Sequence, residues 1–149
     1  MRRTAVLLAT ALGVGRIPVA PATAASLLVT ILLAVLAHLA PASLDPLWLG
    51  VAIVAWTPIA VWASGEAERE LGTDAHPIVI DEVVGMLVTV WGIARMAEPR
   101  PWLFLGAAFL LFRLFDILKP LGIRRTQSLP GGYGVVVDDL LAGIAANLT

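Results

Sequence analysis

Residues 24–40 read AASLLVTILLAVLAHLA, an apolar run that contains no acidic residue, lysine or arginine and is closed by Pro41. A helix that crosses a membrane needs about 20 predominantly apolar residues. The chain of 149 residues is 59% hydrophobic and 14% charged, whereas a soluble domain carries about 25% charged residues. The run and the composition together predict a membrane protein.

Further apolar segments follow along the chain. We expect membrane segments at residues 47–64, 78–94 and 102–118, and a shorter one at 135–148. Residues 65–74 are the most polar stretch, which indicates a solvated helix end or loop. Residues 131–134 (GGYG) predict a flexible loop before the last segment. The sequence thus predicts an all-α, multi-spanning membrane helical bundle with four to five membrane segments, forming a single domain over residues 1–149.

The N-terminus has the three parts of a secretory signal: Arg2 and Arg3, an apolar run at 5–12, and small residues at 20–26. Arg16 and two prolines interrupt that pattern, so we expect a short helix and a Gly/Pro loop that belong to the mature protein. Arginine and lysine mark the cytoplasmic side of membrane proteins. That rule places Arg2, Arg3, Arg16, Lys119, Arg124 and Arg125 inside, although Arg95 and Arg100 count against this orientation.

Charge and cysteine content exclude several functions. The net charge is −1 and no basic stripe is present, so we expect no nucleic-acid partner. Because the chain has no cysteine, it contains no disulfide, no thiolate nucleophile and no cysteine-ligated zinc.

Five of the eleven acidic residues lie among apolar residues: Asp81, Glu82, Asp116, Asp138 and Asp139. A charged side chain at the centre of a membrane helix costs roughly 2.5–3.5 kcal/mol on insertion scales, and such side chains usually face a bundle interior or cavity. The net stability of a fold is only about 5–15 kcal/mol. Five such carboxylates therefore require neutralising cations.

Two kinds of cation are possible. Arg113 and Lys119 lie three residues on either side of Asp116, which allows ion pairs on one helix face. Those pairs leave the two acidic pairs, 81–82 and 138–139, without a partner. Hard oxygen ligands of this kind suit Mg²⁺, which is commonly held by a few carboxylates and a substrate phosphate. We expect His76 to be an interfacial polar residue rather than a ligand.

The two acidic pairs have similar surroundings, IVIDEVV at 78–84 and VVVDDLL at 135–141. Each is followed within four residues by a glycine, Gly85 and Gly143. Small residues allow close approach of helices in membranes, so these glycines predict that both acidic pairs meet at one ion.

Groups that bind phosphate accompany the acids. The planar guanidinium of Arg113 suits a phosphate, although the same side chain is also a candidate structural partner of Asp116. The pair Arg124 and Arg125 suits anionic lipid headgroups. A loop followed by a helix N-terminus can hold phosphate. The loop at 13–23 precedes the apolar run, and the hydroxyls of Thr23 and Ser26 lie where the two meet.

Four motifs occur in order: P-x-x-P-x-T-x-x-S at 18–26, DAHPIVIDEVVGM at 74–86, FR-x-x-D-x-x-KP at 112–120 and GG-x-G-x-x-x-DD at 131–139. Together they resemble the phosphatidylglycerophosphatase A family over nearly the whole chain. The resemblance implies a bacterial inner-membrane enzyme that uses Mg²⁺ to hydrolyse phosphatidylglycerophosphate to phosphatidylglycerol and phosphate. The family's first loop reads PGTxGS, whereas here Ala22 and Ala25 replace both glycines.

This reading assigns roles to the site residues. Asp81, Glu82, Asp138 and Asp139 would bind Mg²⁺, and Asp116 would be a further ligand or the general base, which makes Asp81, Asp116 and Asp139 the expected catalytic residues. Arg113 and Lys119 would hold the phosphate of a phospholipid in the bilayer, with Thr23 and Ser26 at its headgroup. A CDP-alcohol phosphotransferase is disfavoured because its DGxxAR core is absent. An ion- or proton-coupled transporter remains the alternative, because it also carries intramembrane carboxylates.

Overall fold

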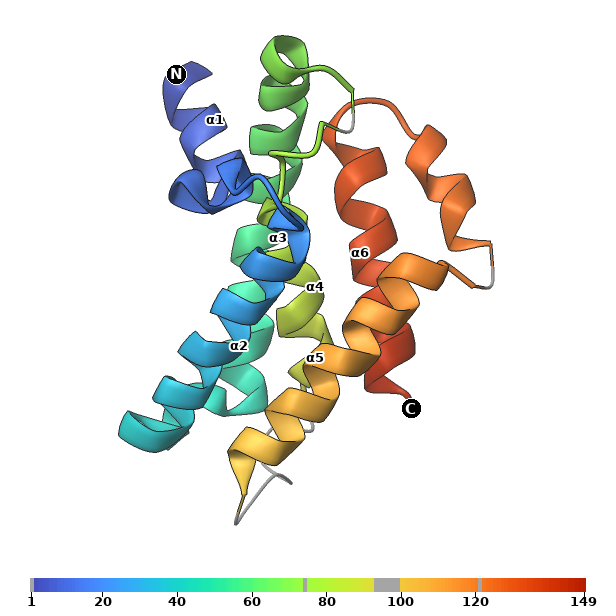
Figure 1. Ribbon diagram of the computed structural model, residues 1–149. Helices are drawn as coiled ribbons and strands as arrows, with labels where there is room; N and C mark the ends of the chain where they lie inside the picture. Colours follow the sequence, from blue (N-terminus) through green and yellow to red (C-terminus); the bar gives the residue numbers. More distant parts are fainter. Residues whose placement is uncertain (1, 74, 93–99, 121) are drawn as a thin grey trace.

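The computed structural model describes residues 2–73, 75–92, 100–120 and 122–149 (Figure 1). All regular elements within these residues are helices, which confirms the all-α prediction. Three residues used in the sequence interpretation, Asp74, Ala94 and Arg95, lie outside the described residues.

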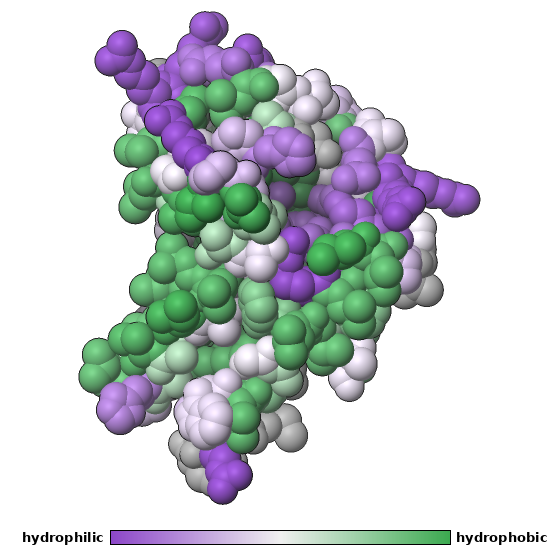
Figure 2. Space-filling view, viewed as in Figure 1, coloured by the Kyte–Doolittle hydropathy of each residue, from purple (hydrophilic) through white to green (hydrophobic). Residues whose placement is uncertain are grey.

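Among the described residues, three helices are long and apolar enough to cross a membrane: α2 (Pro21–Leu39), α3 (Pro46–Leu71) and α5 (Pro101–Leu118). Each begins with proline, whose fixed φ suits the first helical turn and whose missing N–H costs nothing there. Their outer faces carry exposed aliphatic side chains such as Val54 and Leu110. These apolar side chains form much of the lower surface in Figure 2, as expected for contact with lipid.

The predicted count of four to five membrane segments is too high, because two of the expected segments are short helices. Helix α4 (Ile80–Val90) has 11 residues and α6 (Gly132–Asn147) has 16. At 1.5 Å per residue they reach about 17 and 24 Å, less than the roughly 30 Å of a bilayer core. Both helices are apolar because they pack inside the bundle. Hydropathy does not distinguish a helix that is apolar for this reason from one that contacts lipid.

The N-terminal segment packs against the start of α4. Helix α1 (Arg2–Ala9) lies against α3, and the 3₁₀ helix η1 (Ala11–Arg16) follows it. The amide of Val79 donates to the carbonyl of Ala9 at 2.8 Å. A Cβ on Gly15 would lie 2.0 Å from the carbonyl oxygen of Pro77, so only glycine fits. These contacts hold the loop that leads into α4.

Helices α4 and α6 cross in direct backbone contact. A Cβ on Gly143 would lie 2.5 Å from the carbonyl oxygen of Gly85. A Cβ on Gly85 would meet the ring of Phe112 at 2.5 Å and the carbonyl oxygen of Asp139 at 3.1 Å. The close approach predicted from these glycines is confirmed, and it places both acidic pairs on neighbouring helices.

Two loop predictions have different outcomes. Helix α3 continues to Leu71, so the polar stretch after residue 64 is largely a helix end, as expected. The prediction of a flexible loop at 131–134 is wrong, because α6 already begins at Gly132. A Cβ on Gly132 would lie 2.0 Å from the carbonyl oxygen of Val61, so this glycine serves helix packing. Of the three glycines at 131–134, only Gly131, with φ of +60°, has a backbone conformation that favours glycine.

The polar residues gather at one end of the bundle. The N-terminal ends of α2, α4 and α6 and the C-terminal end of α5 point to the same end as α1 and the 3₁₀ helix η4 (Ile123–Ser128) (Figure 1). A further 3₁₀ helix, η2 (Pro41–Leu44), lies between α2 and α3 in the chain. Polar groups on four helices are therefore available to a single site.

Candidate active site

One cavity of about 330 Å³ gathers the acidic residues singled out from the sequence. It opens at the junction of polar and apolar surfaces, where Figure 2 shows hydrophilic atoms in a hollow between hydrophobic ones. Its charged lining comes from α4, α5, α6 and the residue after α5: Asp81, Glu82, Arg113, Asp116, Lys119, Asp138 and Asp139.

Each acidic pair has a local reason for its position. Asp81 and Glu82 lie in the first turn of α4, where the positive end of the helix dipole favours carboxylates. Asp138 and Asp139 lie two turns into α6, a helix whose glycines and alanines allow neighbouring helices to approach closely. The residues Asp138, Asp139 and Glu82 are each 3% exposed.

Arg113 is paired with Glu82. Its Nη1 lies 2.6 Å from Oε1 and 2.8 Å from Oε2 of Glu82. The hydroxyl of Ser26 donates to Oε2 of Glu82 at 2.6 Å, and Ser26 is fully buried. The same Arg113 nitrogen lies 3.0 Å from Oδ2 of Asp116. Glu82 is therefore held by a cation and a hydroxyl from two different helices.

Lys119 joins two further carboxylates. Its Nζ forms an ion pair with Oδ2 of Asp138 and lies 3.7 Å from Oδ1 of Asp116. Burial lowers the pKa of Lys119, but the hydrogen bond that its ammonium donates to Asp138 and the nearby carboxylate charges outweigh this effect and raise the pKa above its ordinary value. Asp116 thus lies between Arg113 and Lys119, as the spacing along the helix predicts.

Asp81 and Asp139 differ from the other carboxylates. Oδ1 of Asp81 and Oδ2 of Asp139 are buried, and within the described residues they have no hydrogen-bond partner. Both residues line the same cavity. A buried polar atom without a partner costs about 1–3 kcal/mol, and more when it is charged. These two oxygens are available to an additional ligand.

The donor set suits a hard divalent cation. In the part of the chain that the structure describes, no three His, Asp or Glu side chains are already grouped as metal ligands. The two unpartnered carboxylate oxygens are nevertheless of the type that Mg²⁺ prefers, and Mg²⁺ usually keeps several waters beside one or two carboxylates. The other two predicted ligands, Glu82 and Asp138, form ion pairs with Arg113 and Lys119. These pairs explain why the four predicted ligands are not grouped around one point.

The charge balance of the cavity also favours a cation. Five carboxyl groups and two protein cations line the cavity, so the acidic groups outnumber the cations by three. A phosphate monoester is itself an anion, and like charges in a partly buried site repel strongly. Binding such a group here requires further positive charge.

The hydroxyl residues predicted at the headgroup lie in different places. Thr23, in the first turn of α2, lines the cavity. Ser26 is not among the lining residues, because its hydroxyl lies behind Glu82 and also donates to the carbonyl of Ala22 at 2.8 Å. Arg124 and Arg125 on η4 are exposed and lie outside the cavity lining.

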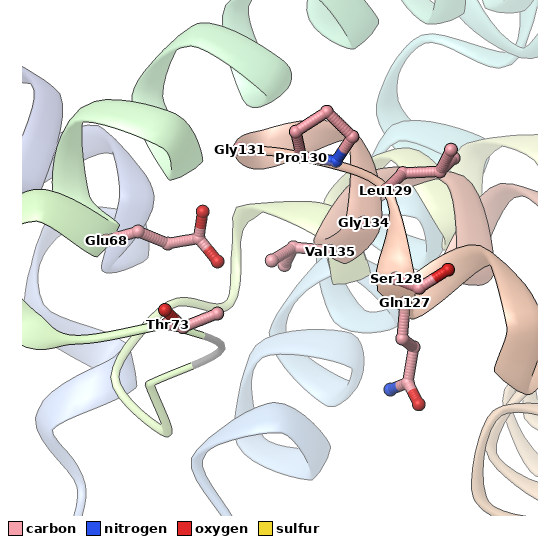
Figure 3. Close-up of a pocket in the computed structure, with 9 residues that line it drawn as sticks. All are labelled: Glu68, Thr73, Gln127, Ser128, Leu129, Pro130, Gly131, Gly134 and Val135. Atoms are coloured by element: carbon pink, nitrogen blue, oxygen red, sulfur yellow. The ribbon is translucent and has the colours of Figure 1, made fainter.

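Two polar lining residues were not singled out from the sequence as site residues. His76 lines the cavity from the loop before α4, and its position five residues before Asp81 was an available signal. Gln127 lines it from η4, and no motif points to it. Gln127 also borders a separate hollow of about 290 Å³ that contains Glu68 and Thr73. In Figure 3 its amide points away from Glu68 and Thr73.

The family model for phosphatidylglycerophosphatase A matches residues 7–149, which include every residue of this cavity. The chain belongs to the phosphatidylglycerophosphatase A family. The protein is accordingly an enzyme, a phosphatase of phospholipid metabolism whose helices suit a membrane. No solved structure matches the chain.

Curated relatives agree with this assignment. A putative phosphatidylinositol-3-phosphatase of Bacteroides thetaiotaomicron is 40% identical over 93% of this chain and 86% of its own length. The phosphatidylglycerophosphatase A of Haemophilus influenzae is 34% identical over 94% and 82% of the two chains. The Escherichia coli phosphatidylglycerophosphatase A is 33% identical over 93% and 76%.

Proposed function

We propose that this protein is a Mg²⁺-dependent phosphatase that converts phosphatidylglycerophosphate to phosphatidylglycerol and phosphate. The observation that carries the proposal is the pair of unpartnered buried oxygens on Asp81 and Asp139, in a cavity that also presents Arg113 and Lys119. We place the enzyme in the bacterial inner membrane with the site on the cytoplasmic side. Arg2, Arg3, Arg124 and Arg125 at the same end of the bundle support that orientation.

The residues divide into three tasks. Asp81 and Asp139, with Glu82 and Asp138 beside them, would hold Mg²⁺. When bound, the ion supplies positive charge to the phosphoryl oxygens and makes a bound water more acidic. Arg113 and Lys119 bind the phosphate oxygens, exchanging part of their contact with the carboxylates for contact with substrate.

Asp116 is the candidate general base. Its carboxylate lies between the two cations that bind phosphate, 3.0 Å from Arg113 and 3.7 Å from Lys119. From that place it accepts the proton of the attacking water as the new bond to phosphorus forms and the bond to the lipid's alcohol oxygen breaks, and it then returns this proton to the leaving oxygen, which departs as the alcohol. Thr23 lies at the N-terminus of α2 and orients the headgroup, and Ser26 keeps Glu82 in place.

A second substrate has support from one relative. The Bacteroides protein named as a putative phosphatidylinositol-3-phosphatase has the higher identity, 40%, against 34% and 33% for the two phosphatidylglycerophosphatases. Phosphatidylinositol phosphate is therefore the second candidate, and it presents the same phosphate monoester to the cavity.

The test is phosphate release by the purified protein in mixed micelles. We expect turnover of phosphatidylglycerophosphate with Mg²⁺, none with EDTA, and recovery when Mg²⁺ is added back. Asp81→Asn should abolish turnover while the protein stays folded, and Glu66→Gln, which removes a surface ion pair with Arg69, should not. Full activity in EDTA or in Asp81→Asn would refute the metal site. Cation or proton flux without phosphate release would favour the transporter alternative.

A further inference from the structure

A second hollow adjoins the catalytic cavity and has no part in the mechanism above. Its volume is about 460 Å³, and Ala20, Pro21 and His76 line both spaces. Beyond this common wall it is lined by η1 and the loop after it, including Arg16 and Ile17. A ligand that extends out of the catalytic cavity past His76 would enter this hollow.

The hollow has the opposite charge to the catalytic cavity. Its lining contains Arg16 and His76 and no acidic side chain. The ion pairs among the described residues use Arg69, Arg113 and Lys119 as cations, so Arg16 has no carboxylate partner there. Arg16 is also exposed, and its guanidinium has the planar donor geometry that suits a phosphate.

The N-terminus of α2 contributes to the same wall. Ala20 is its N-cap and Pro21 its first residue, and no side chain caps this end of the helix. The first amides of a helix lack intrahelical partners and carry the positive end of the helix dipole. Pro21 has no N–H, and the next two residues of α2, Ala22 and Thr23, line the catalytic cavity, so this helix end favours an anion on the catalytic side of the shared wall.

The same loop carries apolar side chains at the membrane boundary. Ile17 and Pro18 line the hollow, and Val19, which follows them, is 77% exposed. The membrane helix α2 begins two residues later. An anion held by Arg16 is therefore next to groups that suit lipid, an arrangement that fits a charged group joined directly to a diacylglycerol.

We propose that this hollow binds the phosphodiester of the lipid substrate, with Arg16 as the residue that recognises it. The inference rests on the proposed function and adds a substrate class to it. The terminal monoester lies in the catalytic cavity, the polyol crosses the wall of Ala20, Pro21 and His76, and the diester lies against Arg16. The enzyme therefore selects lipids that carry both a diester and a monoester, with glycerol or inositol between them. Phosphatidic acid, whose monoester is attached directly to the diacylglycerol, lacks the group that Arg16 binds.

The test compares two lipids in the full-length enzyme with Mg²⁺. Arg16→Gln should lower kcat/KM for phosphatidylglycerophosphate by about 10- to 100-fold, the size of one charged hydrogen bond or two, mainly through KM. Its kcat/KM for phosphatidic acid should stay within about twofold of the wild type. Arg16→Lys should recover part of the loss because it keeps the charge. Arg69→Gln, which removes an exposed arginine outside both cavities, is the matched control.

Product inhibition separates the two phosphate sites. Short-chain phosphatidylglycerol carries only the diester. Its inhibition constant should therefore rise in Arg16→Gln by the factor by which kcat/KM for phosphatidylglycerophosphate falls, whereas the inhibition constant of inorganic phosphate should not change. Equal effects on both lipids, or no effect of Arg16→Gln, would overturn the diester site.

A thermal shift makes the inference independent of turnover. Short-chain phosphatidylglycerol should raise the Tm of the wild type and not that of Arg16→Gln. If the wild type fails to hydrolyse phosphatidylglycerophosphate but keeps this difference, the proposed function fails and the diester site stands. If the wild type is active and the two proteins shift equally, the diester site fails alone.

Discussion

Gly143 of α6 lies so close to Gly85 of α4 that a Cβ on Gly143 would be 2.5 Å from the Gly85 carbonyl oxygen. Each glycine follows its acidic pair by four residues or fewer, so this contact sets the distance between the pairs. The obstructing atom belongs to the backbone and cannot rotate away. Because Gly85 and Gly143 have no side chains, the two helices approach closely, and this approach determines the spacing of the two acidic pairs.

Gly143→Ala should separate α4 from α6 and lower activity at least tenfold, with a loss of stability of about 1–3 kcal/mol from overpacking. Activity assays and unfolding in a denaturing detergent measure the two effects. Gly106→Ala on α5 is the matched control, because its Cβ would meet nothing within 4 Å. That variant should keep full activity and gain up to about 1 kcal/mol from helix propensity. Similar behaviour of the two variants would show that the contact does not position the site.

Arg113→Gln should destabilise the protein by about 3–5 kcal/mol, because it leaves Glu82, which is 3% exposed, without its cation. The double variant Arg113→Gln/Glu82→Gln should regain part of that stability and remain inactive, since the phosphate ligand is still missing. Arg69→Gln, which removes an exposed ion pair, should change stability by less than about 1 kcal/mol. A fully stable Arg113→Gln would contradict the structural part of this role.

Asp139→Asn should remove the stabilisation that Mg²⁺ provides. A ligand that binds only the folded protein raises Tm, so the wild type should shift upward as Mg²⁺ is added. In Asp139→Asn this shift should vanish, while the Tm in EDTA stays close to that of the wild type, because the oxygen that is replaced has no hydrogen-bond partner to lose. Thermal unfolding with and without Mg²⁺ measures both, and Glu66→Gln should keep the wild-type shift. An undiminished shift in Asp139→Asn would exclude this residue as a ligand.

Asn147 should contribute to stability without contributing to catalysis. Its side-chain amide donates to the carbonyls of Val88, Thr89 and Trp91 at 3.1, 2.9 and 2.8 Å, which satisfies the C-terminal end of α4. Asn147→Leu should cost about 1–3 kcal/mol, because these acceptors lose their donor. KM and the Mg²⁺ requirement should stay unchanged, since Asp81 lies at the opposite end of α4. A changed Mg²⁺ requirement would contradict this prediction, because it would show that the C-terminal end of α4 affects the position of Asp81.

Much of the site could be predicted from local patterns. The position of Asp116 between Arg113 and Lys119 follows from helical periodicity, because residues three apart share a helix face. The contact of Gly85 with Gly143 follows from the repeated acidic pair and glycine. The pairing of Arg113 with Glu82 could not be predicted in this way, since 31 residues separate them and no periodicity links two helices.

The number of membrane helices shows the limit of hydropathy. Residues 78–84 and 135–141 are as apolar as a lipid-facing helix because they face protein on nearly all sides. Transfer free energy is the same for a side chain buried in lipid or in a bundle, so composition does not separate α4 and α6 from α2, α3 and α5.

Residue types and spacing alone were sufficient to deduce a helical membrane protein, its five acids among apolar residues, the cations beside Asp116 and the family. Local interactions and transfer energies determine these properties, and both can be read along the chain. Tertiary packing decided which carboxylates are neutralised by Arg113 and Lys119 and which, Asp81 and Asp139, keep unpartnered oxygens. It also placed Arg16 beside the catalytic cavity. Those outcomes depend on distances between helices. The contacts of Gly15, Gly85, Gly132 and Gly143 determine these distances, and such contacts exist only in the folded chain.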